Sequence, residues 1–413
     1  MRIAPDSPVR RAERRLARGI AQVTGAALGP YQTAVIRIGF SFTWLFFLIR
    51  EWPHRHEMYG PDGPWSWTLA RQMISGNDAF TALMWSDGTV WFEFVYLFAV
   101  AASALLLLGW RTRTMSVLFM VGVLSVQNRS IFMGDGGDNV IHLMAIYLVL
   151  TRCGQVWSLD ARRERRRRAD EDAPGPESAP GPDATGIVLW SLTGLALSGI
   201  TVLDLVSWGW ALIFWGLWFV HALWWTVRRY APDGSPALRE ARTVLDVIAN
   251  LAHNGALLVI IAEVCLIYAT AGWYKIQGSR WQDGTAAYYP VNLDYFSPWP
   301  VISDLMSSSG VLVMVITYGT VIVQVAFPFT LMKRRVKNVL LAVMMLEHAA
   351  FAVALGLPFF SLAMITADAV FLPTGFLLLL GGWAGRLRGM RPFVRERAPV
   401  GGDTAAPDRT LVG

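Results

Sequence analysis

Apolar runs alternate with short polar turns along nearly the whole chain. A helix needs about 20 apolar residues to cross the hydrocarbon core of a bilayer. Ten runs fit this length well enough to predict membrane spans: 31–49, 89–108, 114–133, 139–151, 187–206, 208–225, 251–274, 310–332, 338–355 and 359–383. Pro373 interrupts the last run and either kinks one helix or separates two short pieces. The predicted fold class is therefore all-α, a polytopic helical membrane protein with about ten transmembrane helices.

The polar stretches divide the chain into six regions. Residues 161–186 change from an arginine-rich run to a mixture of Pro, Gly, Asp and Glu, which predicts a disordered linker. The full set comprises a basic N-terminal segment (1–30), a first membrane part (31–160), this linker (161–186), an extra transmembrane hairpin with a basic turn (187–245), a second membrane part (246–383) and a polar tail (384–413). The N-terminal segment has arginines spaced to permit an amphipathic surface helix.

Charge gives these spans an orientation. The chain carries a net charge of +6, and its arginines cluster beside the ends of the apolar runs. Basic clusters mark cytoplasmic loops, so we expect a multi-pass protein of the cell membrane with both termini in the cytoplasm. The loops Arg50–Gly88 and Lys275–Ser309 then face the exported side. A location in the membrane also explains the basic charge better than a nucleic-acid partner does.

Ionisable groups within the spans are candidates for function, because a charge in the bilayer normally pairs, lines a cavity or does chemistry. We expect Arg37 and Glu93 to form a structural ion pair. Glu347 and His348 are adjacent, so at most one of them faces a given cavity. The remaining candidates are Asp138, His142, Asp204, His253, Glu263, Lys275 and Asp368.

Metal, disulfide and common soluble chemistries have weak support in this sequence. His54 and His56 have a spacing that a metal could use, and Asp135 with Asp138 could hold a cation, but a polar turn explains the aspartates as well. We expect no metal site. The two cysteines lie in apolar helical segments and predict no disulfide framework. No phosphate-binding loop, dinucleotide fingerprint or nucleophile elbow occurs in the sequence.

Lys275 is distinctive because the chain contains 33 Arg and three Lys, and the other two, Lys333 and Lys337, share one basic turn. A lysine at a membrane boundary can be an anchor that snorkels to the interface, or it can be a reactive amine. Of the other polar groups, His142 lies about one turn inside the exported end of its span. His253 is 22 residues from Lys275, roughly 33 Å along a helix, so the two cannot share a site.

Several short motifs occur in a specific order. They are IRIGF (36–40), GDNVIH (137–142), WSLD (157–160), AGxxKI (271–276), WQDGTA (281–286) and LPFFSL (357–362). Together they resemble the HTTM family, the membrane domain of vitamin K-dependent gamma-glutamyl carboxylase and its bacterial relatives. The resemblance covers about residues 30–160 and 245–372. The hairpin at 187–225 has no counterpart in the family pattern.

The resemblance implies a quinone-linked chemistry. In the carboxylases the lysine of AGxxK is taken as the base that deprotonates vitamin K hydroquinone, so Lys275 becomes the candidate base and His142 an auxiliary group. A lysine must be neutral to accept a proton, and apolar surroundings favour the neutral amine. The implied cofactor is reduced vitamin K or menaquinone, and the residues expected to bind it are Asn139, Trp273, Tyr274 and Trp281.

The expected function is thus oxygenation of a reduced quinone, with carboxylation of a secreted peptide or protein as a coupled step, as in a lyase. The expected partners are the lipid bilayer, a lipid-soluble quinone and such a peptide or protein substrate, without nucleic acid. Two alternatives stay open: a DoxX-like quinone-linked partner, and a non-catalytic membrane protein that matures, or gives immunity to, a secreted peptide. A transporter gains no support, since no internal repeat is visible.

Overall fold

The computed structural model describes residues 8–171, 183–231 and 234–387, which form α-helices joined by turns and short 3-10 helices. The α-helices are α1 (Pro8–Gly25), α2 (Pro30–Arg50), α3 (Arg55–Tyr59), α4 (Trp67–Ile74), α5 (Thr89–Leu108), α6 (Thr112–Arg129), α7 (Gly136–Leu150), α8 (Leu159–Glu171), α9 (Ala184–Val202), α10 (Trp208–Tyr230), α11 (Pro236–Gln277), α12 (Ser279–Gln282), α13 (Tyr288–Val291), α14 (Pro300–Ser307), α15 (Gly310–Ala326), α16 (Arg334–Ala354), α17 (Pro358–Asp368) and α18 (Thr374–Leu387). The all-α prediction is confirmed.

Among the described residues, seven helices are long and apolar enough to cross a membrane: α2, α5, α9, α10, α11, α16 and the stretch Gly310–Thr330, in which α15 continues into a 3-10 turn. These seven coincide with seven of the ten predicted spans. They identify a multi-pass membrane protein.

The other three predicted spans are shorter or more polar. Helix α7 has 15 residues, and α6 has 18 residues that include Ser, Thr, Gln, Asn and Arg side chains. The last run divides in two, since α17 ends at Asp368 and α18 begins at Thr374, after Pro373. The proline ends the helix because its ring removes a backbone donor and crowds the preceding turn.

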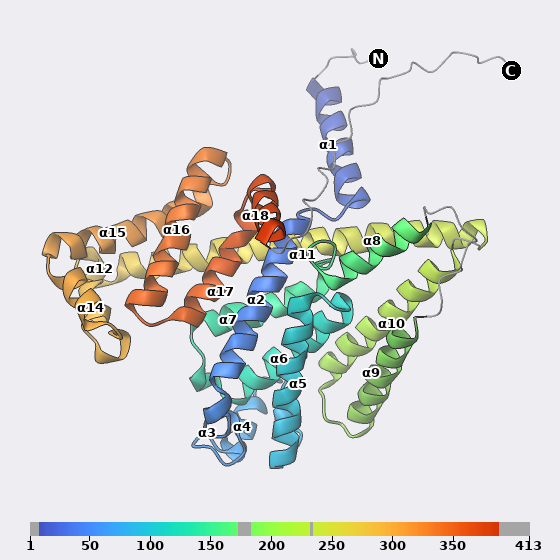
Figure 1. Cartoon of the computed structure of the whole chain (residues 1–413), viewed down its shortest axis with the longest axis horizontal. Helices are drawn as coiled ribbons and strands as arrows, with labels where there is room; N and C mark the ends of the chain where they lie inside the picture. The colour runs from blue at the N-terminus through green and yellow to red at the C-terminus, as the bar shows by residue number, and fades with distance from the viewer. Residues whose placement is uncertain (1–7, 172–182, 232–233, 388–413) are drawn as a thin grey trace. The chain divides into compact units, whose positions relative to one another are not determined.

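The described residues up to Leu372 form one compact unit, and those from Pro373 to Leu387 belong to a second. In the first unit, α2, α5, α6, α7 and α17 pack against one another and bury a common apolar core (Figure 1). Small residues allow the close packing, as a Cβ on Gly122 of α6 would lie 3.0 Å from the Ala99 side chain of α5. This bundle gives the remaining helices a fixed support.

Helix α11 runs unbroken for 42 residues and packs against α1, α7, α10 and α15 (Figure 1). Its start at Pro236 lies well before residue 251, where the apolar run begins. The intervening turns are helical because they contain good helix formers such as Ala, Leu, Arg and Glu, without glycine or an internal proline. One helix thus carries side chains from the basic turn to Lys275.

The segment predicted as a disordered linker, 161–186, is helical at both ends. Helix α8 extends to Glu171, and α9 begins at Ala184, while residues 172–182 lie outside the described residues. Glu164 pairs with Arg167 and Arg168 at 3.0 Å, one turn further along α8. Such pairs and the helix propensity of arginine stabilise the helix despite its high charge, which the prediction overlooked.

Arg37 does not pair with Glu93, which corrects the expected ion pair. The Arg37 side chain is fully buried and donates to four backbone carbonyls, those of Leu106 at 2.6 Å, Leu107 at 2.9 Å, Trp157 at 2.8 Å and Cys153 at 3.2 Å. The first two belong to the last turn of α5, whose carbonyls have no partner within the helix. Arg37 therefore closes the end of α5 and fixes the following turn.

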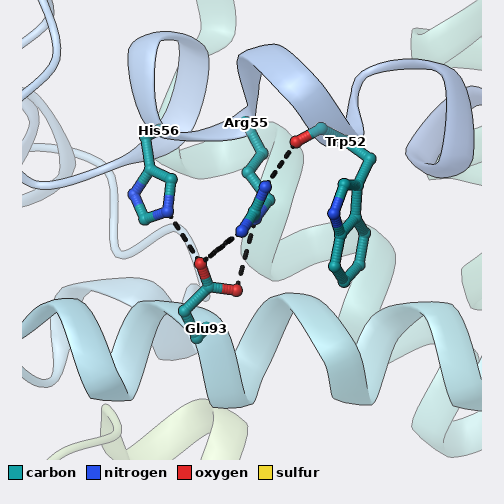
Figure 2. A network of polar contacts seen from close by, with 4 residues as sticks. All are labelled: Trp52, Arg55, His56 and Glu93. Carbon is teal, nitrogen blue, oxygen red and sulfur yellow. Dashed lines mark hydrogen bonds and ion pairs between the residues drawn. The ribbon is translucent and has the colours of Figure 1, made fainter.

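Glu93 instead accepts hydrogen bonds from the short helix α3, as Figure 2 shows. Its carboxylate lies 2.7 Å from the Arg55 guanidinium and 2.7 Å from His56 Nε2. The guanidinium also lies over the Trp52 ring, at 4.5 Å. His56 thus hydrogen-bonds to Glu93. The described residues contain no group of three or more His, Cys, Asp or Glu side chains that could hold a metal.

The WSLD motif (157–160) caps the start of α6. Asp160 accepts hydrogen bonds from the backbone of Arg111 at 2.8 Å and Thr112 at 2.7 Å, which begin α6. Gly109, between α5 and α6, has a φ of +70° and approaches the Ser158 side chain so closely that a Cβ would lie 2.4 Å from it. Glycine is required there. Arg37 of the IRIGF motif and Asp160 of the WSLD motif therefore have structural roles, since they cap α5 and α6.

Candidate functional site

The last two turns of α11 place Lys275 beside two neighbouring helices. The Lys275 amine donates to Gln324 Oε1 on α15 at 2.6 Å, and the Gln324 amide donates to Glu347 Oε1 on α16 at 3.0 Å. Helices α11 and α15 approach closely at Gly272, where a Cβ would lie 2.5 Å from the Val325 side chain. Lys275, Gln324 and Glu347 thus form a hydrogen-bonded row across three helices, which we call the lysine row.

Aromatic and apolar groups surround this row. The Lys275 amine lies 5.3 Å from the centroid of the Trp281 ring, within the distance at which a cation and an aromatic face attract each other. Gln324 is 4% exposed, while Lys275 is half-buried. Among the described residues Gln324 is the hydrogen-bond partner of the amine, so the nitrogen retains capacity for a further polar contact.

A second buried cluster lies next to the lysine row. The Tyr268 hydroxyl donates to Asp368 Oδ2 at 3.0 Å and lies 3.0 Å from His348 Nε2. A single hydroxyl hydrogen cannot serve both, so His348 donates its Nε2 hydrogen to the tyrosine oxygen. All three side chains are at most 2% exposed. We call these residues the tyrosine cluster.

The tyrosine cluster has unused hydrogen-bonding atoms. His348 Nδ1 and Asp368 Oδ1 are buried, and neither has a partner among the described residues. An unpaired buried polar atom costs free energy of about 1–3 kcal/mol, so such atoms in a protein call for an explanation. Glu347 and His348 are neighbours on α16, and Tyr268 and Lys275 lie two turns apart on one face of α11. The two clusters therefore make one polar region inside apolar helices.

The adjacent residues Glu347 and His348 point into different parts of this region. Glu347 contacts Gln324 of α15, whereas His348 contacts Tyr268 of α11. The two side chains thus contact different helices, α15 and α11.

His142 occupies a different environment from Lys275. Its Nδ1 lies 3.0 Å from Gln127 Oε1 on α6, and the Gln127 amide donates to the backbone oxygen of Asp138 at 2.8 Å. No hydrogen bond or ion pair joins His142 to Lys275 in the part of the chain that the structure describes. The structure therefore does not bring the two predicted site residues into contact.

Two contacts join α7 and the turn after it to α11. The backbone nitrogen of Arg152 donates to His253 Nδ1 at 2.7 Å, and the Tyr147 hydroxyl lies 3.5 Å from Glu263 Oε1. The two helices therefore run antiparallel, and both contacts on α11 come before the turn that carries Lys275.

The four residues predicted to bind the cofactor lie in different places. Trp281 lies over the Lys275 amine. Trp273 and Tyr274 precede Lys275 on α11 and are 61% and 74% exposed, because successive helical positions turn by about 100°. Asn139 is exposed on α7. Of the four, Trp281 is the one that contacts the candidate base.

The turn Asp135–Asp138 has a structural explanation. Asp135 accepts from the backbone of Gly137 and Asp138 at the start of α7, and Asp138 accepts from the Asp135 nitrogen at 2.9 Å. This reciprocal arrangement is a capping box, which satisfies free backbone donors at a helix start.

Sequence reasoning missed Gln324 and Tyr268. Gln324 is an amide within an otherwise apolar run, and such a residue in a membrane helix signals an interhelical hydrogen bond. Tyr268 lies seven residues, or two helical turns, before Lys275, and this spacing places both on one face of α11. Both signals are present in the printed sequence.

Fold and site together define the class: a multi-pass helical membrane protein with a polar region built between α11, α15, α16 and α17. Comparison adds no name to this class. No protein-family model, no curated protein and no solved structure matches the chain.

Proposed function

We propose that this protein is an HTTM-type membrane enzyme in which Lys275 removes a proton from a reduced quinone, of the vitamin K or menaquinone type. The proposed topology has ten membrane segments and both termini in the cytoplasm. The loops Arg50–Gly88 and Lys275–Ser309 then lie on the exported face, and the stretches Arg50–Gly88 and Arg280–Ser309 cover the site. Carboxylation of a secreted peptide or protein is the coupled step that the family resemblance adds.

The observation that carries the proposal is the lysine row. An anchoring lysine would extend to water, whereas the Lys275 amine is held at 2.6 Å from the nearly buried Gln324 amide. This contact fixes the direction of the nitrogen. Glu347, one hydrogen bond further on, supplies a negative charge that stabilises the ammonium after the amine has taken a proton. Such an arrangement suits a general base.

The residues around the amine fit an aromatic, lipid-soluble ligand. Trp281 presents a ring face beside the amine, and the amine retains capacity for one more polar contact. When bound, a reduced quinone supplies the dissociable hydroxyl group and the reducing electrons. Trp281 would orient the ring, and Gln324 would hold the amine toward the hydroxyl. His142 keeps its proposed auxiliary role, which must be exerted at a distance from Lys275.

The decisive experiment compares lysine variants in membranes that are supplied with reduced menaquinone or vitamin K. Lys275→Met and Lys275→Arg should both stop quinol consumption, because neither side chain accepts a proton at neutral pH. Lys333→Met is the matched control, since it removes an exposed lysine from a basic turn. Unchanged quinol turnover in both Lys275 variants would contradict the proposal.

A second measurement separates the coupled reaction from quinone chemistry alone. Incorporation of labelled bicarbonate into protein, dependent on reduced quinone and on Lys275, is expected if carboxylation occurs. Quinol consumption without incorporation would favour the DoxX-like alternative. Absence of both activities, with normal maturation of a secreted peptide in Lys275→Ala cells, would favour the non-catalytic alternative.

A further inference from the structure

Three arginines meet around one tryptophan at the end of α10. The guanidinium carbons of Arg113, Arg152 and Arg228 lie 4.7, 5.9 and 6.0 Å from the centroid of the Trp224 ring. They come from the start of α6, the turn after α7 and the last turn of α10. Segments that are far apart in the sequence thus bring three positive charges to one place.

The charge of this group is not balanced by the neighbouring side chains. Among the described residues, the guanidinium groups of Arg113 and Arg228 make no hydrogen bond or ion pair, and Arg152 donates to the neutral amide of Asn250 at 2.6 Å. Two acidic side chains interact electrostatically with Arg113, and both have other partners: Asp246 lies 3.9 Å from Arg242, and Asp160 caps α6. Like charges gathered without a partner repel one another, so an additional anion would stabilise the group.

The tryptophan itself also has an unused donor. Trp224 is 8% exposed, and its Nε1 is buried without a hydrogen-bond acceptor. Three guanidinium groups thus lie around one indole ring whose N–H has no acceptor among the described residues. Arginine forks match the geometry of phosphate oxygens.

The neighbouring surface of α10 indicates where the phosphate comes from. Phe219, Val220 and Leu223 lie within the two turns before Trp224, and each is more than half exposed. They belong to a helix that is long and apolar enough to cross a membrane. An apolar stripe that ends in a cluster of arginines is complementary to a lipid with acyl chains and an anionic headgroup.

We propose that Arg113, Arg152 and Arg228, grouped around Trp224, bind the phosphate of an anionic phospholipid whose acyl chains lie along α10. The lipid joins the α9–α10 hairpin to the central bundle, because two of the arginines belong to the bundle and the third to the hairpin. The hairpin has a protein contact at the same end, since Arg111 forms a two-pronged ion pair with Asp183, just before α9. This proposal is independent of the quinone site.

The test uses the full chain, purified in detergent and stripped of bound lipid. Phosphatidylglycerol should raise the midpoint of thermal unfolding by several degrees, whereas phosphatidylcholine should have little effect. Inorganic phosphate forms the third arm. An equal rise with phosphate would show that the site takes a free anion, and an equal rise with phosphatidylcholine would show that headgroup charge is irrelevant; either result overturns the lipid assignment.

Variants then locate the site. Arg228→Gln should weaken phosphatidylglycerol binding about tenfold, as expected for the loss of one charge-assisted contact, and Arg228→Lys should weaken it less. Arg229→Gln is the matched control, because it removes one charge from the next position on α10, where the side chain is exposed. Arg228 is also exposed and makes no hydrogen bond within the described residues, so its loss should not prevent folding. Equal binding by the Arg228→Gln and Arg229→Gln proteins would overturn the proposal.

Discussion

In its first half, α11 presents Asn250, His253 and Asn254 to the segment before α2, whereas in its second half it presents Tyr268 and Lys275 to α15, α16 and α17. In the first group every hydrogen bond among the described residues but one, that from the Arg152 guanidinium to Asn250, is with a backbone atom. His253 lies 2.7 Å from both the Leu28 oxygen and the Arg152 nitrogen, and Asn254 donates to the Val23 and Ala26 oxygens. Around the second group, the buried atoms His348 Nδ1 and Asp368 Oδ1 have no hydrogen-bond partner among the described residues, and the Lys275 amine has one, Gln324.

The difference teaches how to separate structure from chemistry among polar groups in a membrane protein. A saturated group is explained by the backbone that it holds, and its removal affects folding. A group with spare hydrogen-bonding capacity is not explained in this way, and unexplained buried polar atoms concentrate at functional sites. Substitutions in the first group should therefore lower stability, and substitutions in the second group should lower activity.

The largest effect on activity is expected at Lys275. Replacement by methionine keeps the length of the side chain and removes the base, so quinol turnover should fall by about 10²–10⁴-fold. The midpoint of thermal unfolding should stay close to that of the parent protein. Activity and unfolding are measured on the same detergent preparation, and a large loss of stability in Lys275→Met would place this residue with the structural group.

The largest effect on stability is expected at His253. The His253→Ala change removes two buried hydrogen bonds and leaves the Leu28 oxygen and Arg152 nitrogen unpaired, which should cost about 2–4 kcal/mol of stability. Turnover per folded molecule should not change. Thermal unfolding followed by tryptophan fluorescence gives the first quantity. A selective loss of turnover without destabilisation would contradict the comparison.

An intermediate effect on activity is expected at Gln324. Gln324→Leu removes the hydrogen-bond partner that orients the Lys275 amine and separates the amine from Glu347. Turnover should fall about tenfold, because the base is still present but is no longer held in the productive direction. This is the size of effect expected when a positioning contact is lost. Thr317→Val is a matched control on α15, because Thr317 contacts the loop at Ala287 rather than the amine.

The smallest effect is expected at the Arg111–Asp183 pair. The Arg111 guanidinium donates to the Asp183 carboxylate and lowers its pKa below the ordinary value of 3.8. A pKa that is lower in the folded state stabilises the protein above that ordinary value, and the contribution is lost as the pH falls through the folded pKa. Since the carboxylate is 40% exposed, Asp183→Asn should cost about 0.5–1 kcal/mol at pH 7.

The pH dependence of stability tests the contribution of the Arg111–Asp183 pair. The difference in stability between parent and Asp183→Asn proteins should be constant from pH 7 to 5 and should shrink below about pH 4. Urea unfolding at several pH values measures it. A difference that grows in acid would show that the carboxylate is not the group stabilised by Arg111.

Hydropathy predicted the seven long apolar helices well, because each buries its backbone groups internally and needs a fixed length of apolar side chains. It predicted polar partners poorly. Arg37 and Glu93 both lie in apolar runs and have opposite charges, yet Arg37 caps α5 and Glu93 pairs with Arg55. Pairing depends on which helix faces which, and a single sequence does not specify that.

The candidate site was predicted at its centre but not at its periphery. The scarcity of lysine identified Lys275, and the loop after it supplied Trp281, which is close in sequence and in space. Gln324 and Glu347 lie 49 and 72 residues further along, so their approach to Lys275 follows from the packing of α11, α15 and α16. The helical form of residues 159–171 was missed because the charge of the segment outweighed its helix propensity in the prediction.

The uninterrupted course of α11 has a mechanical consequence. With 42 residues it measures about 63 Å, roughly twice the hydrocarbon thickness of a bilayer. Sharp bends in helices need causes such as an internal proline, and α11 has none after Pro236. A continuous helix therefore fixes the spacing between the basic turn and the site, and Lys275 lies about 54 Å along the axis from Arg239.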